Sequence, residues 1–282
     1  MAKFYQKYSN SPLKKEVMDR YLNKVVVITG ATGSLGRELC FEFTKRGAKI
    51  AICSRSEDKL KKLSEEISQI GGRLIYKKVD VSIAKDVKQF IKFVIKKYGD
   101  IDVLVNNAGI INAGNFLDLE EKMIEKEISI NYLGPVYFIK EVLPMMLKKQ
   151  NGQIINISSI VYSRPFPFLS TYSASKAALS ALTDAIRSEL QDKRVKIIHV
   201  CMGKLKSGVS LKAEKTGRNK YKSISHSGME PIVAARKIIN NASLGKEIIY
   251  THFESRPILW LNAFFPSFLD KFLYHSKIKT KI

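Results

Sequence analysis

The sequence predicts a doubly wound α/β fold, in which helices cover both faces of a parallel β-sheet. From residue 24 to residue 250, short runs rich in Val and Ile alternate with longer segments of helical periodicity. Strands that alternate with helices in this way form a parallel sheet. The first run, residues 24–29, is an almost unbroken β-branched stretch, which is typical of a strand buried on both faces. The length of 282 residues and the hydrophobic content of 45% fit one such domain.

Each predicted element has its own local signal. Apolar runs predict strands at residues 24–29, 48–53, 73–79, 101–105, 153–157, 195–200 and 247–250. Helical periodicity predicts helices ending near 46, over 56–70 and 83–98, from near 119 through 131, over 135–149 and 170–190, and from 231. Gly71-Gly72 ends the second helix, and Pro231 stands in the first turn of the last one, where proline is tolerated.

Segments of different composition flank the domain, which spans residues 23–252. Residues 1–22 form an N-terminal extension that mixes Lys, Tyr, Ser and Asn and lacks the apolar region of a signal peptide. Residues 253–282 form an aromatic and basic C-terminal extension. Because no run of about 18 apolar residues occurs, we expect no membrane-spanning segment.

Cysteine usage and charge bound the class of protein. Cys40, Cys53 and Cys201 lie far apart in apolar surroundings and lack metal-ligand spacing, so we expect reduced, buried thiols, a cytoplasmic location and no metal site. The net charge of +22 can attract nucleic acid, an anionic membrane or an anionic substrate. Much of it is Lys on predicted helix faces, without a nucleic-acid-binding motif, so nucleic acid is not an expected partner.

A glycine-rich turn follows the first predicted strand and precedes a helix. This is the setting of a dinucleotide-binding turn. Glycines let the backbone approach a pyrophosphate, and the helix N-terminus offers free N–H groups and the positive end of a dipole. We therefore expect the turn to bind a nucleotide through Gly30, Thr32, Gly33, Ser34, Leu35 and Gly36.

The residues after the second predicted strand indicate which dinucleotide is bound. An acidic residue there would bind the 2′-hydroxyl of NAD(H) and repel a 2′-phosphate. This sequence has Ser54 and Arg55 instead, and the planar guanidinium group suits a phosphate. We therefore expect NADP(H) to be preferred over NAD(H). The alternative is that Arg55 is simply solvated at the start of a helix.

Residues 156–176 carry the expected chemistry. Tyr172 and Lys176 lie four residues apart on a predicted helix, so their side chains share one face. An ammonium group within about 4–6 Å would lower the phenol pKa from its usual value of about 10. Ser159 ends a strand 13 residues before Tyr172, where its hydroxyl could bind a substrate oxygen with which Tyr172 exchanges a proton. Taken alone, Tyr-x-x-x-Lys is also an ordinary amphipathic helix fragment.

Together these features resemble the short-chain dehydrogenase/reductase family, whose active site is a Ser, a Tyr-x-x-x-Lys and an Asn. The resemblance covers roughly residues 23–250. It implies a Rossmann fold, with Ser159, Tyr172, Lys176 and Asn131 as catalytic residues. Asn131 would bend its helix and hold a water molecule in a proton relay. A polar residue before Gly-Pro can also merely accompany a helix kink.

The chain departs from the family pattern at two turns. In the glycine turn, Ser34 takes the place of the middle glycine and Gly33 comes one position early. After the sixth strand, Met202-Gly203 replaces the usual Pro-Gly. These departures leave the individual phosphate and nicotinamide contacts less defined than the fold itself.

The resemblance also implies further cofactor contacts. Tyr172 and Lys176 would hold the ribose next to the nicotinamide. The family's adenine, ribose and carboxamide contacts correspond to Asp80, Val81, Asn107, Ala108, Gly109, Leu205 and Ser207. Asp80 could instead cap the following helix, a role that Ser82 could fill equally well.

Two helices and one loop correspond to contact regions of the family. The helices at 135–149 and 170–190 correspond to those that pack against a second subunit, so we expect a homodimer or a tetramer. The alanine-rich stripe of the second helix could instead face only the sheet.

Residues 204–228 correspond to the substrate-covering loop and are strongly cationic. That charge would recruit an acidic substrate or a membrane surface, or simply belong to a solvated loop.

Residues 257–274 contain an unusual density of large apolar side chains, including Trp260. Pro266, Asp270 and Lys271 interrupt them. Such a density of apolar groups has to be buried. Three places remain open: the domain itself or a dimer partner, a membrane surface, or the lid of an apolar substrate pocket. At a membrane each neighbouring basic residue would add about 1 kcal/mol.

We therefore expect an NADP(H)-dependent oxidoreductase that transfers hydride between the nicotinamide and a carbonyl or secondary alcohol. The aromatic C-terminal segment favours a lipophilic small-molecule substrate of the steroid, retinoid or acyl type, and hence a role in lipid metabolism. One alternative is a non-catalytic NADP(H)-binding scaffold or redox sensor. Another is a basic membrane- or nucleic-acid-associated protein built on the same fold.

Overall fold

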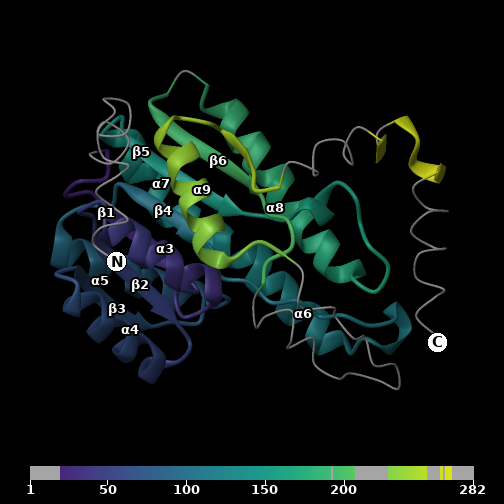
Figure 1. Ribbon diagram of the computed structural model, residues 1–282, viewed down its shortest axis with the longest axis horizontal. Helices are drawn as coiled ribbons and strands as arrows, with labels where there is room; N and C mark the ends of the chain where they lie inside the picture. Colours follow the sequence, from purple (N-terminus) through teal and green to yellow (C-terminus); the bar gives the residue numbers. More distant parts are fainter. Residues whose placement is uncertain (1–19, 192, 207–227, 253–260, 263, 269–282) are drawn as a thin grey trace.

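The computed structural model describes residues 20–191, 193–206, 228–252, 261–262 and 264–268. Its strands are β1 (Val25–Thr29), β2 (Lys49–Ser54), β3 (Arg73–Lys78), β4 (Val103–Asn106), β5 (Gly152–Ile157), β6 (Val195–Cys201) and β7 (Ile248–Tyr250). They form one parallel sheet in the order β3-β2-β1-β4-β5-β6-β7 (Figure 1). The strand order reverses between β1 and β4, which defines a doubly wound sheet. The predicted fold class is confirmed.

Helices cover both faces of the sheet (Figure 1). One face carries α3 (Ser34–Thr44), α4 (Glu57–Gln69) and α9 (Pro231–Ser243). The other carries α5 (Ala84–Tyr98), α7 (Gly134–Lys148) and α8 (Ser170–Glu189). Each layer packs on its own apolar core, so the sheet lies between two hydrophobic clusters.

Strand β1 explains why the first apolar run has no polar interruption. Val26 and Ile28 point into the core under α3 and α9, whereas Val25 and Val27 point into the core under α5 and α7. All four are at most 4% exposed. Because side chains alternate along a strand, one buried on both faces needs an apolar residue at every position.

The helical region around residue 131 is divided into parts. A 3₁₀ turn, η1 (Phe116–Asp118), precedes α6 (Glu121–Ile128), and a π-helix, η2 (Ser129–Leu133), joins α6 to α7. The sequence predicted a helix starting near 119 and a kink before Gly134. A π-helical turn holds an extra residue and re-aims the side chains on it. A Cβ atom at Gly134 would lie 3.1 Å from the Val81 carbonyl oxygen, so glycine lets α7 pass close to the segment after β3.

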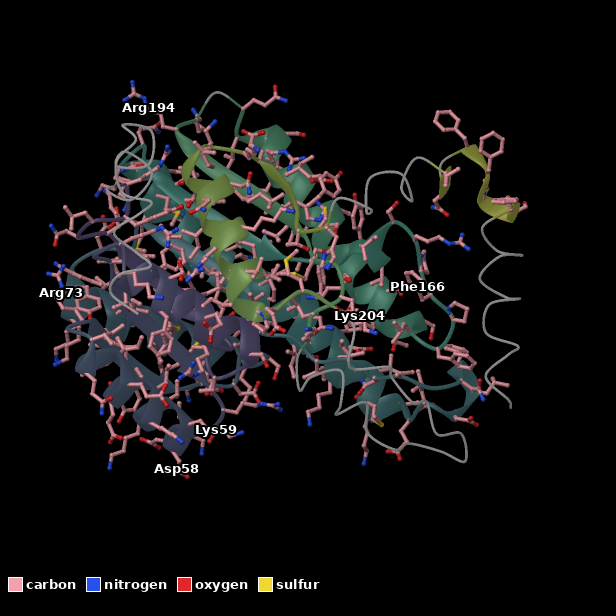
Figure 2. All side chains as sticks on the ribbon, viewed as in Figure 1. Asp58, Lys59, Arg73, Phe166, Arg194 and Lys204 are labelled. Carbon is pink, nitrogen blue, oxygen red and sulfur yellow. The ribbon has the colours of Figure 1, made fainter. Side chains whose placement is uncertain are left out.

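Basic side chains are spread over the molecule. Lys59, Arg73, Arg194 and Lys204 are exposed and stand at separate places around the ribbon (Figure 2). This distribution agrees with the prediction that much of the net charge of +22 belongs to solvated surfaces.

Several predicted features lie outside the described residues: the extension 1–19, the loop residues 207–227 with Ser207, and most of the segment 253–282. The two ends of the cationic loop are described and lie together. The Lys206 N–H donates to the Met229 carbonyl oxygen, and the Met229 N–H donates to the Lys204 carbonyl oxygen, both at 3.0 Å. Among the described residues, every helix is too short or too polar to traverse a bilayer.

Candidate active site

The glycine turn between β1 and α3 packs against the segment that follows β4. Gly30 has φ +62°, and a Cβ atom there would lie 2.7 Å from Ala108 Cα. At Gly36 a Cβ atom would overlap the Gly30 carbonyl oxygen and lie 2.8 Å from Ala31 Cα. Glycine is therefore required at both positions. Gly33 differs, because a Cβ atom there would meet only the Gly30 carbonyl oxygen, at an ordinary 3.4 Å.

Thr29 and Asn107 tie the glycine turn to β4. Thr29 Oγ1 accepts hydrogen bonds from the N–H groups of Asn107 and Ala108, both at 3.0 Å. Asn107 Nδ2 donates to the carbonyl oxygens of Thr29 at 3.0 Å and Gly30 at 3.1 Å. The Asn107 side chain therefore fixes the glycine turn against the end of β4.

The start of α3 fits a dinucleotide phosphate. Within the described chain no side chain caps this helix, whose N-cap residue is Gly33. The first N–H groups of a helix have no partner inside the helix, and they lie at the positive end of its dipole. Thr32 and Ser34 are partly exposed beside them, whereas Leu35 is buried. This end of α3 can therefore hold an anion with backbone donors and two hydroxyl groups.

The residues predicted to face the adenosine lie at the ends of β2 and β3. Ser54 is 8% exposed and ends β2, and Arg55 is exposed immediately after it. Asp80 Oδ1 accepts hydrogen bonds from the backbone N–H of Ser82 at 3.0 Å and from its hydroxyl at 2.6 Å. Asp80 therefore stabilises the turn before α5 instead of capping the helix directly, since the N-cap residue is Ile83.

The two serines after β5 have different surroundings. Ser158 is buried, and its Oγ donates to the Lys176 carbonyl oxygen at 3.2 Å and shares a hydrogen bond with Ser180 Oγ at 2.8 Å, in which either hydroxyl can be the donor. Ser159 is the N-cap residue of η3 (Ile160–Tyr162), and its hydroxyl accepts from the Val161 N–H at 3.4 Å. It also hydrogen-bonds Tyr172. Of the pair, Ser159 is the one that reaches the predicted catalytic tyrosine.

Tyr172 and Lys176 are brought together on α8. The Lys176 ammonium lies 5.9 Å from the centroid of the Tyr172 ring. It donates to the Ile157 carbonyl oxygen at 2.9 Å, which fixes it at the end of β5. Lys176 is 5% exposed, and Tyr172 is partly exposed. The expected juxtaposition of Ser159, Tyr172 and Lys176 is present.

The expected lowering of the Tyr172 pKa by Lys176 is not found, and the expectation needs correction. Burial raises the pKa of Tyr172 to about 12, and the charge of Glu127 contributes to the rise. The hydrogen bond with Ser159 lowers this pKa but does not outweigh burial. Burial also lowers the pKa of Lys176 to about 8, against the charge of Glu127. Desolvation therefore dominates at both groups and favours their neutral forms.

Asn131 lies in the π-helix η2 and is fully buried. Its Oδ1 accepts from the Ile110 N–H at 2.9 Å, and its Nδ2 donates to the Ile110 carbonyl oxygen at 2.9 Å and to Ser175 Oγ at 3.0 Å. The side-chain amide thus joins the loop after β4 to α8. Its predicted role in a water relay remains a prediction.

Gly109 connects the cofactor side of the site to the catalytic side. A Cβ atom there would lie 3.3 Å from Asn131 Oδ1 and 3.6 Å from Lys176 Nζ. The two other described candidates stand farther along the same edge of the sheet. Val81 follows β3 and is 7% exposed, and Leu205 follows β6 in a bridge with Met229.

Sequence reasoning missed a buried carboxyl group in this region. Glu127 is fully buried; its Oε1 accepts from the Asn112 N–H at 2.8 Å, and its Oε2 accepts from Thr171 Oγ1 at 2.6 Å. The signal that could have revealed it is spacing. Glu127 precedes Asn131 by four residues and Thr171 precedes Ser175 by four, so each pair shares a helix face.

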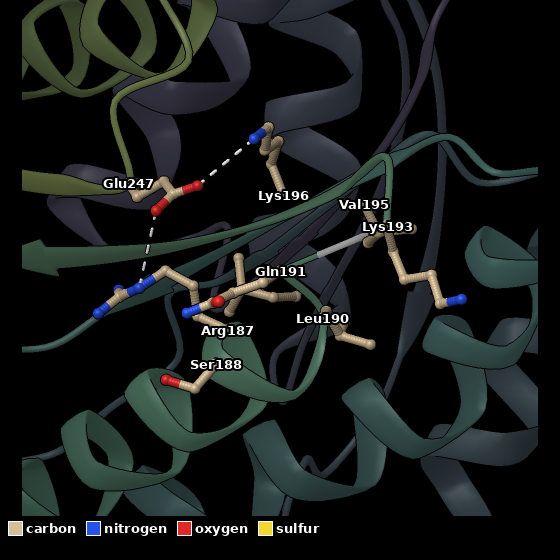
Figure 3. A pocket seen from close by; sticks show the side chains of 9 residues that line it. Arg187, Ser188, Leu190, Gln191, Lys193, Val195, Lys196 and Glu247 are labelled. Carbon is tan, nitrogen blue, oxygen red and sulfur yellow. Dashed lines mark hydrogen bonds and ion pairs between the residues drawn. The ribbon is translucent and has the colours of Figure 1, made fainter.

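A polar cavity of about 130 Å³ lies at the other end of the sheet, where β6 begins (Figure 3). Glu247 ion-pairs there with Lys196 at 3.4 Å and with Arg187 Nε at 3.8 Å. None of the predicted site residues lines it. The predicted site residues lie instead at the carboxyl ends of the strands, where ligands of doubly wound sheets bind.

Residues 24–217 match the model of the short chain dehydrogenase family. The chain belongs to the short-chain dehydrogenase/reductase family. A bovine relative, dehydrogenase/reductase SDR family member 7B, is 33% identical over 234 residues, which cover 80% of this chain and 71% of the relative. An Arabidopsis thaliana relative, 11-beta-hydroxysteroid dehydrogenase-like 4A, is 33% identical over 251 residues, which cover 87% and 82%. As a short-chain dehydrogenase/reductase, the chain is an NAD(P)-dependent oxidoreductase.

Solved structures agree with the family. A short-chain dehydrogenase/reductase from Burkholderia phymatum in complex with NAD has a TM-score of 0.80 at 19% identity, covers 93% of this chain and 96% of its own, and supports the fold alone. An alcohol dehydrogenase from Thermococcus sibiricus complexed with 5-hydroxy-NADP has a TM-score of 0.72 at 28% identity and covers 80% and 95%. Such structural relatives thus bind NAD or NADP.

Proposed function

We propose that the protein transfers hydride between NADP(H) and a lipophilic carbonyl compound or alcohol, with Tyr172 exchanging the proton. The observation that carries this proposal is the convergence of Ser159, Tyr172 and Lys176 beside the segment that holds the glycine turn. Gly109 belongs to that segment and stands next to Lys176 Nζ. A substrate bound there would meet a hydroxyl, a phenol and an ammonium group at one place.

The chain's own residues would act as follows in the reductive direction. A bound nicotinamide supplies the hydride. Ser159 donates a hydrogen bond to the substrate carbonyl oxygen, and Tyr172, which is neutral at pH 7 because burial raises its pKa to about 12, donates a proton to the same oxygen. Lys176 binds the neighbouring ribose. Asn131 keeps α8 in register with the loop after β4 through its bonds to Ile110 and Ser175.

The preference for NADP(H) rests on Arg55. Its side chain is exposed directly after β2, beside Ser54, where a 2′-phosphate of the cofactor would lie. A guanidinium group offers a planar set of donors that matches phosphate. Among the described residues, no acidic side chain forms an ion pair with Arg55, so its charge is available to a ligand.

The lipophilic class of substrate rests on the C-terminal segment. Asn262 accepts a hydrogen bond from Arg164 at 2.8 Å and donates one to the Ser163 carbonyl oxygen at 2.7 Å, which ties the segment to the loop between η3 and α8. Leu261, Phe265 and Phe268 beside it are 40 to 64% exposed. Through Asn262 these exposed apolar groups are tethered to the loop that precedes Tyr172, which would suit an apolar substrate. The name of the plant relative, 11-beta-hydroxysteroid dehydrogenase-like 4A, agrees with this class.

A substrate panel tests the proposed class. Oxidation of NADPH is measured with steroid ketones, retinaldehyde, long-chain acyl carbonyls and sugar carbonyls at equal concentration. We expect turnover with one or more of the apolar compounds. Activity restricted to small polar sugars would reject the lipophilic class while leaving hydride transfer intact.

Two contacts with larger partners form part of the proposal. The exposed apolar side chains of Leu261, Phe264, Phe265 and Phe268, in a chain of net charge +22, would bind peripherally to an anionic membrane. Ala174, Ala181 and Ala185 form an exposed stripe on α8 that suits close packing with a second subunit. Flotation with phosphatidylserine vesicles, compared with phosphatidylcholine vesicles, tests the membrane contact. Sedimentation of wild type, compared with Ala181→Glu, tests the contact with a second subunit. If the protein does not float with either kind of vesicle at any salt concentration, the membrane contact is rejected. If wild type is a monomer, the contact with a second subunit is rejected.

A further inference from the structure

The polar contacts around the catalytic helix form two parallel sets between the same three segments. α6 continues into η2 and lies beside α8 (Figure 1). In the first set, Asn131 binds the loop at Ile110 and α8 at Ser175. In the second set, one helical turn earlier, Glu127 binds the loop at Asn112 and α8 at Thr171. We call these the asparagine rung and the glutamate rung.

Each rung ends on α8 at the residue directly before a proposed catalytic side chain. Thr171 precedes Tyr172, and Ser175 precedes Lys176. Ser175 Oγ also donates to the Tyr172 carbonyl oxygen at 2.7 Å, so the two rungs are joined within the first turns of the helix. In the described chain no side chain caps the N-terminus of α8, whose N-cap residue is Leu169. The glutamate rung is therefore a side-chain contact that holds the opening turn of α8, in addition to the contact of Ser159 with Tyr172.

We propose that Glu127 is a positioning residue for the reaction, because its carboxyl group fixes Thr171, and therefore Tyr172, against the loop that follows β4. This inference rests on the proposed role of Tyr172. The carboxyl group is fully buried and accepts from two donors at 2.8 and 2.6 Å, so both oxygens are engaged. A group with such contacts keeps one orientation, and misplacement of a reacting group by about 1 Å can cost on the order of 10²-fold in rate.

Glu127 also acts on the catalytic pair through its charge. Its negative charge raises the pKa of Tyr172 and of Lys176, and burial raises the pKa of Glu127 itself. The ionisable groups that face it from α8 are Tyr172 and Lys176, while the loop contributes the neutral Asn112. Replacing the carboxylate by a neutral isostere should therefore lower both pKa values.

Two variants separate position from charge. Glu127→Gln keeps groups that can bond Asn112 and Thr171 but removes the charge, whereas Thr171→Val removes one bond and keeps the charge. Steady-state reduction and oxidation are measured from pH 6 to 10 with NADPH or NADP⁺. The pKa of Lys176, about 8, falls within this range. Because the Glu127 charge raises that pKa, we expect Glu127→Gln to shift the corresponding change of kcat, in reduction and in oxidation, toward lower pH by about 0.5 to 1 pH unit. We expect Thr171→Val to lower kcat roughly 10- to 100-fold, while the pH dependence of kcat and the KM for the cofactor stay unchanged.

The matched control is Glu125→Gln, an exposed glutamate on the same helix, which should behave as wild type. Thermal melting and NADPH binding establish that each variant is folded. The inference would be overturned if both Glu127→Gln and Thr171→Val had the kcat of wild type and the same pH dependence of kcat as wild type. If Glu127→Gln does not fold, a wild-type kcat in Thr171→Val overturns it alone. Full activity of Tyr172→Phe would instead reject the proposed function on which it rests.

Discussion

The ammonium group of Lys176 lies 5.9 Å from the centroid of the Tyr172 ring, on the same face of α8. The contact is held from outside the helix, because Lys176 Nζ also donates to the Ile157 carbonyl oxygen at 2.9 Å. Ile157 is the last residue of β5, and Ser159 follows it two positions later. The end of this strand therefore brings the three proposed catalytic side chains into one compartment.

The direction of the reaction should respond to pH through Tyr172. Burial raises the pKa of Tyr172 to about 12, so the phenol is protonated at neutral pH. Carbonyl reduction needs the protonated phenol and alcohol oxidation needs the phenolate. We expect kcat for oxidation to rise with pH between 7 and 10, while kcat for reduction stays level or falls. Oxidation that is fastest near pH 6 would contradict the assignment of Tyr172 as the base.

Arg55 should set the choice of cofactor. In Arg55→Asp the 2′-phosphate loses a charged donor and meets a carboxylate, so kcat/KM for NADPH should fall about 10- to 100-fold relative to NADH, because a charge-assisted hydrogen bond contributes about 1.5–3 kcal/mol. Lys59→Asp makes the same change of charge at an exposed position on α4 (Figure 2). It should leave the NADPH/NADH ratio within about twofold. An equal effect of both variants would show that only net charge matters.

Two glycines of the turn should respond differently to alanine. A Cβ atom at Gly36 would overlap the Gly30 carbonyl oxygen, so Gly36→Ala should lower the free energy of unfolding by about 1–3 kcal/mol. A Cβ atom at Gly33 would meet that oxygen only at 3.4 Å, so Gly33→Ala should fold normally. Its NADPH affinity should nevertheless fall, because a methyl group would occupy the approach of a phosphate to the turn. Chemical denaturation and fluorescence titration with NADPH measure the two effects. Normal stability in Gly36→Ala would be the contrary outcome.

Stability should depend on pH through His199. This imidazole is 1% exposed, and its Nε2 lies 2.9 Å from Ser180 Oγ. Burial lowers its pKa, against Asp184, which raises it. The unfolded chain therefore binds a proton at a pH where the folded chain does not, and stability is lost as pH falls below about 6.5, by at most about 1.4 kcal/mol per pH unit.

The variant His199→Gln should flatten this dependence. The free energy of unfolding is measured by urea denaturation at pH 7.5, 6.5 and 5.5 for wild type, His199→Gln and the control His252→Gln. We expect a smaller slope in the first variant and the wild-type slope in the control. Parallel slopes in all three proteins would exclude His199 as the source.

Features encoded by local spacing were predictable from the sequence. The β-branched run of β1, the turn from Gly30 to Gly36 and the pair Tyr172 and Lys176 each carry their signal within a few residues. Their arrangement follows from the rule that parallel strands place their carboxyl ends at one edge of a sheet. The fold class and the meeting of Ser159 with Tyr172 could therefore be predicted from the sequence alone.

Features that depend on burial and on contacts between distant segments were predicted wrongly or missed. The sign of the Tyr172 pKa shift was wrong, because the sequence shows the spacing to Lys176 but not the desolvation that outweighs it. Glu127 was overlooked because its partners, Asn112 and Thr171, lie 15 and 44 residues away. The π-helix around Asn131 was expected only as a kink, since its extra residue has no local sequence signal.

The proposed function depends on Tyr172 as the proton donor, and one comparison of variants tests this role most directly. Wild type and Tyr172→Phe are assayed for NADPH oxidation with the same panel of carbonyl compounds, after NADPH binding and thermal melting show that both proteins are folded. We predict that wild type turns over at least one apolar carbonyl, and that Tyr172→Phe binds NADPH equally but loses on the order of 10²–10⁴-fold in kcat. Equal turnover by the two proteins, or NADPH binding with no turnover in wild type, would contradict it.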